Sequence, residues 1–98
     1  MMGESTRVLT LADFTPRLGT GFEVAVQGGS VTLKLQAAQE LPSMGRSGGS
    51  FRLEFIGPAQ PMLPQSTYSF RFGDEAVGIF IVPIGQEPRG TRYEAIFI

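Results

Sequence analysis

Apolar and polar residues alternate along most of this chain with a spacing of two, the period of a β-strand that buries one face. The pattern predicts strands over residues 22–27, 31–38, 51–56, 67–72, 77–82 and 92–98. Turn residues separate these runs about every ten positions, and no long segment has a helical period. The sequence therefore predicts an all-β fold: a small antiparallel six-strand barrel or a two-layer sandwich.

Side chains of one parity in each predicted strand should form the interior, because successive side chains of a strand point to opposite faces. Tight hairpins are expected at residues 27–30, where two glycines meet, and at residues 73–76. The expected core residues are Phe22, Val24, Leu33, Leu35, Phe51, Leu53, Phe55, Tyr68, Phe70, Phe80, Val82 and Phe97.

One short N-terminal helix is expected from about Leu11 to Leu18. Thr10 and Asp13 have the spacing of a capping box, with Asp in place of the usual Glu, and Pro16 limits the helix to one or two turns. We expect this helix to cover one end of the β-core rather than to bind a partner. Residues 1–7 are expected to form a disordered leader, and residues 8–98 a single β domain.

The segment 42–50 is rich in glycine and serine and carries Arg46 at its centre. Such a composition is typical of a flexible loop. The sequence therefore predicts a mobile loop that is dispensable for folding and is first cleaved by a protease at Arg46. The segment 57–64, with its three prolines, is expected to be ordered and extended and to place Leu63 in the core.

The last two predicted strands are apolar on both faces, which is typical of strands that are covered on both sides. If Tyr93 and Phe97 point inward, Ile96 and Ile98 point outward. If Phe80 and Val82 point inward, Ile79 and Ile81 point outward as well. The interface candidates are therefore Ile79, Ile81, Ile96 and Ile98. We expect a second copy or another protein to cover them and favour a homo-oligomer; the N-terminal helix is the alternative cover.

Composition narrows the function classes. The 98 residues contain no histidine and no cysteine, so the commonest general base, the commonest transition-metal ligand and the thiolate nucleophile are missing. A net charge of -1 argues against nucleic-acid binding and against a basic membrane-binding patch. Glu54 and Glu94 should form ion pairs with Arg52, Arg71 or Arg92 rather than act as a catalytic dyad. We expect no enzymatic activity, no metal and no cofactor.

No apolar run approaches the ~18 residues of a transmembrane helix. The run at residues 8–12 is also too short for the apolar part of a signal peptide. A cytoplasmic protein, or one that enters an assembly built in the cytoplasm, is therefore expected, and not one secreted by a signal peptide.

Several short motifs form a recognisable set. They are Leu-Ala-Asp-Phe at 11–14, Gly-Thr-Gly-Phe at 19–22, Phe-Arg-Leu-Glu-Phe at 51–55 with Gly57 and Pro58, Leu-Pro-Gln at 63–65 before Tyr68, Phe-Ile-Val-Pro at 80–83 and Tyr-Glu-Ala-Ile-Phe at 93–97. With them the sequence resembles an uncharacterised family of small bacterial all-β domains of unknown function, over about residues 8–98. The resemblance implies one β-domain and an association with phage-tail-collar-like proteins, and it brings no catalytic residues to carry over to this chain.

Together these observations predict a non-enzymatic structural or protein-interaction module, with a place in a phage-tail-like or collar-associated assembly. The alternative is a small β-barrel that binds an apolar ligand. The two differ in interior volume, because a carrier needs an open apolar cavity and a structural module does not.

Overall fold

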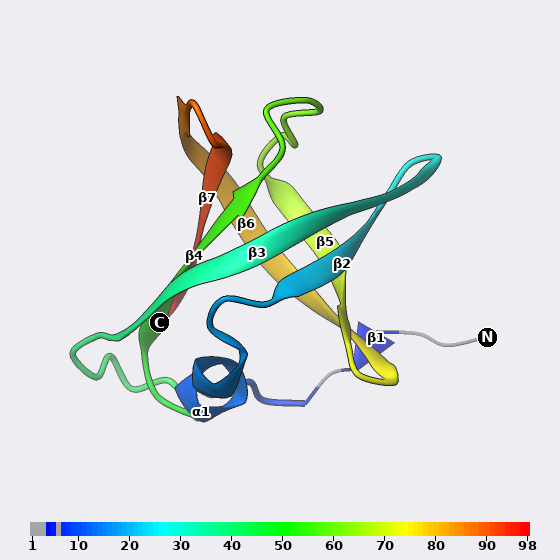
Figure 1. The fold of residues 1–98 in the computed structure, drawn as a ribbon. Helices are drawn as coiled ribbons and strands as arrows, with labels where there is room; N and C mark the ends of the chain where they lie inside the picture. The colour runs from blue at the N-terminus through cyan, green and yellow to red at the C-terminus, as the bar shows by residue number, and fades with distance from the viewer. Residues whose placement is uncertain (1–3, 6) are drawn as a thin grey trace.

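Six antiparallel strands follow one another around a closed barrel in the computed structural model, which describes residues 4–5 and 7–98 (Figure 1). The order around the ring is β6-β5-β2-β3-β4-β7, and pairing between β7 and β6 closes it. The structure thus resolves the choice between barrel and sandwich in favour of the barrel. The strands are β2 (Gly21–Val26), β3 (Gly29–Glu40), β4 (Phe51–Gly57), β5 (Ser66–Phe72), β6 (Glu75–Glu87) and β7 (Gly90–Phe97).

The longest strand, β6, closes the barrel because it changes neighbours along its length. Its first half pairs with β5 and its second half with β7, with a shift of register between Pro83 and Gly85. Proline has no N–H to donate to a ladder, so it is commonly found at a bulge. Strands β6 and β7 both extend beyond the predicted ranges 77–82 and 92–98, so only Pro88 and Arg89 form the turn between them.

The interior is filled by the side chains of the alternating strands. The predicted core is confirmed for Phe22, Val24, Leu33, Leu35, Phe51, Leu53, Phe55 and Phe70, which are all buried. Tyr68 and Phe97 are half-buried and pack against this core. Across the barrel, the ring centroids of Phe22 and Phe55 lie 5.9 Å apart, and those of Phe55 and Phe70 lie 5.2 Å apart. Aromatic rings therefore occupy the centre of the barrel.

The predicted parity of β6 is wrong. Ile79 and Ile81 are 1% and 0% exposed, whereas Phe80 is 50% exposed and Val82 is half-buried. The physical reason is the hairpin register: Phe72 pairs with Glu75 across a two-residue turn, so Ile79 lies opposite Tyr68 on the core side of the sheet. The prediction that Ile79 and Ile81 point outward therefore fails, and Phe80 takes their place on the surface.

The N-terminal helix covers one end of the barrel, as predicted. Helix α1 (Leu11–Phe14) continues into the 3-10 turn η1 (Thr15–Arg17), and both lie below the strands in Figure 1. The predicted capping interaction is present, because the backbone N–H of Thr10 donates to the Asp13 carboxylate at 2.8 Å. Phe14 is 0% exposed and its ring lies 5.3–6.3 Å from four other phenylalanine rings. Leu18 is 46% exposed, so it does not share this role.

The chain before the helix runs from the edge of β6 to the barrel end. Glu4–Ser5, which the sequence prediction places in a disordered leader, form β1 and pair in parallel with Ala76 and Val77 of β6. Arg7 forms ion pairs with Asp13 at 3.2 Å and with Glu75 at 2.9 Å. The rest of the predicted leader, residues 1–3 and 6, lies outside the described residues.

The segment 42–50 is docked against the barrel end, in contrast to the mobile loop predicted from its composition. One guanidinium nitrogen of Arg46 donates to the carbonyl of Leu9 at 2.8 Å and to that of Gly49 at 2.9 Å. The same guanidinium lies over the rings of Phe51 and Phe97, at 5.4 and 5.2 Å from their centroids. Arg46 therefore ties the loop to the N-terminal segment and to the end of β7.

We expect trypsin to cleave after Arg46 slowly, because the side chain that the protease must bind is held in these contacts. Arg46→Lys keeps a trypsin site but loses the planar guanidinium that binds two carbonyls and covers two rings. It should therefore be cleaved faster at position 46 than the wild type, as measured by mass spectrometry of a time course. First cleavage of the wild type at Arg46, at the same rate as the variant, would contradict the docked loop.

Candidate functional site

Three large apolar side chains of β6, β7 and the residue after β7 are exposed on the outside of the barrel: Phe80, Ile96 and Ile98, at 50%, 45% and 65%. We refer to these three residues as the apolar strip. The predicted outward direction of Ile96 and Ile98 is thus confirmed. Phe80 and Ile96 each lie two residues from the pair Val82–Glu94, where pairing between β6 and β7 ends. They therefore flank the place where the two strands separate, and α1 covers the barrel end without covering them.

Beside this strip, a ladder of charges covers the outer face of β4 and β7. Arg52 forms ion pairs with Glu94 and, at 2.8 Å, with Glu54, and Arg92 lies 4.0 Å from Glu54 and 3.7 Å from Glu87. The predicted ion pairs of the strand carboxylates are confirmed for these two arginines. The hydrogen bond from Arg52 is the main cause that lowers the pKa of the Glu54 carboxyl below its usual value. The lowered pKa means that the ladder stabilises the ionised form of Glu54. A general acid needs a raised pKa instead.

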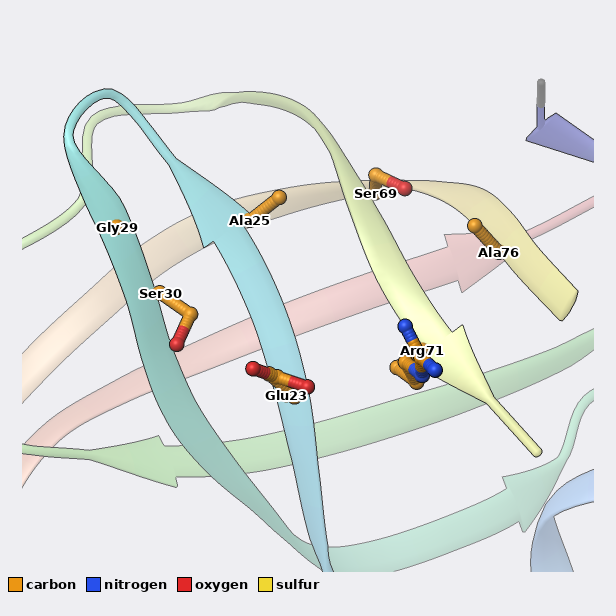
Figure 2. A pocket seen from close by; sticks show the side chains of 7 residues that line it. All are labelled: Glu23, Ala25, Gly29, Ser30, Ser69, Arg71 and Ala76. Carbon is orange, nitrogen blue, oxygen red and sulfur yellow. The ribbon is translucent and has the colours of Figure 1, made fainter. Parts of the chain in front are cut away.

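A shallow trough of about 390 Å³ crosses the outer face of four strands on another sector of the barrel (Figure 2). Glu23 and Arg71 contribute the charged groups, and the remaining positions carry small side chains or none. The lining residues are Glu23 and Ala25 from β2, Gly29 and Ser30 from β3, Ser69 and Arg71 from β5, and Ala76 from β6.

The trough lies where two neighbouring strands are only weakly joined. Within the described part of the chain, Val24 and Phe70 are the one residue pair that links β2 to β5. Because the two strands are antiparallel, the residue before Val24, Glu23, lies opposite the residue after Phe70, Arg71. No ion pair joins these two side chains among the described residues, so the charges face the trough separately.

A second depression, of about 360 Å³, lies at the end of the barrel opposite α1. It is lined by Val26, Gln27, Tyr68 and residues 61–64. The loop beside it is fastened at two points. The backbone N–H of Leu63 donates to the Tyr93 hydroxyl at 2.8 Å, and the Tyr68 hydroxyl donates to the carbonyl of Pro64 at 2.6 Å. Leu63 is buried, which confirms the ordered loop predicted for this segment.

The described residues contain no group of three or more acidic, cysteine or histidine side chains arranged to hold a metal ion. In the same part of the chain, no helix has the length and the apolar character needed to cross a membrane.

The fold covers nearly the whole chain, and so does one family model. The model of a domain of unknown function, DUF6916, matches residues 9–97. The chain belongs to this family. No curated protein and no solved structure matches the chain. The description of DUF6916 assigns no activity.

Sequence reasoning found one part of this surface and missed another. It identified Ile96 and Ile98 from their parity next to Tyr93, which β7 retains. It missed Phe80, because the apolar run 77–84 offers no polar residue to mark the outer face. It also missed the trough, whose residues come from four strands and meet only through the register of the barrel. No local pattern could have brought Glu23 and Arg71 together.

Proposed function

We propose that this chain is a non-enzymatic interaction module that associates with further copies of itself through the apolar strip of Phe80, Ile96 and Ile98. As the resemblance described above implies, the module would serve in a larger assembly of phage-tail-like or collar-associated type. The observation that carries the proposal is the exposure of Phe80 and Ile96, which flank the last residue pair of β6 and β7, and of Ile98, two residues beyond Ile96. Large apolar side chains that gather on an exposed surface mark interaction sites in soluble proteins.

The strand geometry at the same place supports association. Beyond Val82 and Glu94, β6 and β7 no longer pair with each other within the described residues. The side of β7 that faces β6 therefore presents backbone N–H and C=O groups at Ala95–Phe97, which are able to pair with another strand. Apolar side chains and free backbone groups together are typical of surfaces to which a second strand is added.

Two other function classes fit the structure less well. A carrier needs an open interior, but the rings of Phe22, Phe55 and Phe70 occupy the centre of this barrel. Glu54 does not fit the role of a general acid, because the hydrogen bond from Arg52 lowers the pKa of its carboxyl group. The filled interior favours a function exerted from the outer surface.

We expect the protein to have a mass above that of one chain in light scattering after size exclusion, at high micromolar concentration. Ile96→Lys should shift it toward the monomer while the β-sheet circular dichroism survives, because a lysine at the centre of an apolar interface leaves a charge to be desolvated. Thr32→Lys is the matched control: it adds the same charge at an exposed position of β3, away from the strip, and should leave the mass unchanged.

A wild-type protein that remains a clean monomer at this concentration would contradict self-association. Equal effects of Ile96→Lys and Thr32→Lys would show that added charge, and not the apolar strip, controls the mass.

A further inference from the structure

The trough on β2, β3, β5 and β6 has a floor of small residues that line up across the strands. Ser30 pairs with Ala25, and Ala25 in turn lies opposite Ser69 because Val24 pairs with Phe70. In the next row, Arg71 pairs with Ala76. Short side chains in successive strands therefore make a channel that runs across the sheet, as Figure 2 shows.

Among the described residues, the two charged side chains of the trough face each other across neighbouring strands without forming an ion pair. The other arginines of the chain bind a carboxylate, a carbonyl or an aromatic ring. Among the described residues, Arg71 does none of these, and Glu23, which lies opposite it, also forms no ion pair or hydrogen bond. Opposite charges that face each other across two strands normally pair. Here both remain available to a ligand.

Gly29 keeps one end of the trough open. A Cβ atom built at Gly29 meets no other atom within 4 Å, and its φ is not positive, whereas the neighbouring Gly28 has φ +85°. The hairpin therefore requires glycine at position 28 but not at position 29. A side chain at position 29 would project into open space beside the trough, so glycine there leaves room for a ligand.

We propose that the trough binds an extended peptide segment of a partner protein, with a basic side chain over Glu23 and an acidic side chain over Arg71. In an extended peptide, side chains two residues apart point the same way and lie about 6.5–7 Å apart, whereas adjacent strands lie about 4.8 Å apart. The flexible side chains of lysine and glutamate can span the difference between these two spacings. This site lies on a different sector from the apolar strip and does not depend on self-association.

The shape of the trough favours a peptide over a small molecule. A small-molecule site encloses most of its ligand's surface. This trough is open to solvent and spans four strands, so it matches a chain that lies across the sheet. The floor of Ala25, Ser30 and Ser69 lets the peptide backbone approach, and the two serine hydroxyls can bond to its amides.

The test is a titration of the ¹⁵N-labelled protein with blocked pentapeptides, followed by the chemical shifts of the backbone amides. The probes are four peptides that differ only at positions 2 and 4. They are Thr-Lys-Thr-Glu-Thr (the Lys/Glu peptide), Thr-Lys-Thr-Lys-Thr (the all-lysine analogue), Thr-Glu-Thr-Glu-Thr (the all-glutamate analogue) and Thr-Gln-Thr-Gln-Thr (the neutral peptide). Free lysine and free glutamate test for a small zwitterion. We expect the Lys/Glu peptide to shift the amides of Glu23, Ala25, Ser69 and Arg71 with millimolar affinity. The neutral peptide should bind at least about fivefold more weakly.

Three variants test the geometry. Arg71→Glu should weaken binding of the Lys/Glu peptide. Because the variant then carries glutamate at both positions 23 and 71, it should bind the all-lysine analogue more tightly than the Lys/Glu peptide. A misfolded protein could not show this reversal of preference. Gly29→Val should weaken every peptide by filling the trough while leaving the unfolding free energy nearly unchanged. Lys34→Glu is the control, since it makes a similar charge change on the same sheet outside the trough.

The proposal fails if no peptide shifts the trough amides, or if all four peptides bind equally. It also fails if the free amino acids bind as tightly as the Lys/Glu peptide, which would make the trough a small-molecule site. The proposal fails as well if Lys34→Glu weakens peptide binding as much as Arg71→Glu does. In that case the net charge of the protein, and not the charge at position 71, would control binding.

Discussion

Phe14→Ala is expected to lower the free energy of unfolding by about 3–5 kcal/mol, the range found when a fully buried phenylalanine is truncated. Phe14 is 0% exposed and its ring contacts those of Phe22, Phe51, Phe72 and Phe97. These rings belong to four strands and meet at the end of the barrel that α1 covers. Removal of the central ring leaves a cavity among groups that are fixed by the strands and cannot close around it.

The measurement is urea unfolding followed by circular dichroism, with Leu18→Ala as the control. Leu18 follows the same helical segment but is exposed, so its truncation should change the unfolding free energy by less than about 0.5 kcal/mol. A loss below about 1 kcal/mol for Phe14→Ala would show that the segment lies on the barrel without closing it.

Helix α1 contributes little stability of its own, because four residues form barely one hydrogen-bonded turn. Its position depends on contacts with distant parts of the chain: Phe14 in the barrel end, the ion pairs of Arg7 with Asp13 and Glu75, and the bond from Arg46 to the Leu9 carbonyl. The composition of the segment 42–50 could not reveal this, since one arginine among glycines and serines is equally compatible with a free loop.

The strands could be predicted from the sequence wherever polar residues mark one face. In β2, Glu23 separates Phe22 from Val24, and in β4, Arg52 and Glu54 alternate with three buried residues. Each of these patterns fits only one parity, so the core residues of β2 and β4 were predicted correctly. In β7, the polar Glu94 indicates the outer face. Ile96, two residues further on, was therefore predicted to point outward as well.

The parity of β6 could not be predicted by that route, because the run 77–84 has no charged residue. The usable signal is the hairpin that precedes it. A two-residue turn at Gly73 and Asp74 places Phe72 opposite Glu75, and the buried Phe70 then lies opposite Val77. Counting from this turn gives Ile79 and Ile81 as core residues. The closure of the barrel and the trough depend on pairings between distant strands, for which the sequence contains no local signal.

The hairpin register leads to the second large effect. Ile79→Lys is expected to unfold the protein, whereas Phe80→Lys, one residue away, should leave it folded. Ile79 is 1% exposed within an apolar core, where a lysine has to be buried without a partner charge or lose its proton. The expected cost exceeds about 4 kcal/mol, which is a large part of the stability of a small domain. Phe80 is 50% exposed, so a lysine there keeps its ammonium group in water.

If Ile79→Lys does not fold at all, the milder variants Ile79→Ala and Phe80→Ala still allow the unfolding free energies at the two positions to be compared. Truncation of a buried isoleucine costs about 2–5 kcal/mol, and truncation of the half-exposed phenylalanine should cost clearly less. Both are measured by urea unfolding of dilute protein, at a concentration where self-association does not contribute to the stability. A greater loss for Phe80→Ala than for Ile79→Ala would return β6 to the opposite parity. In that case Phe80 would lie in the core, and the apolar strip would lose its aromatic member.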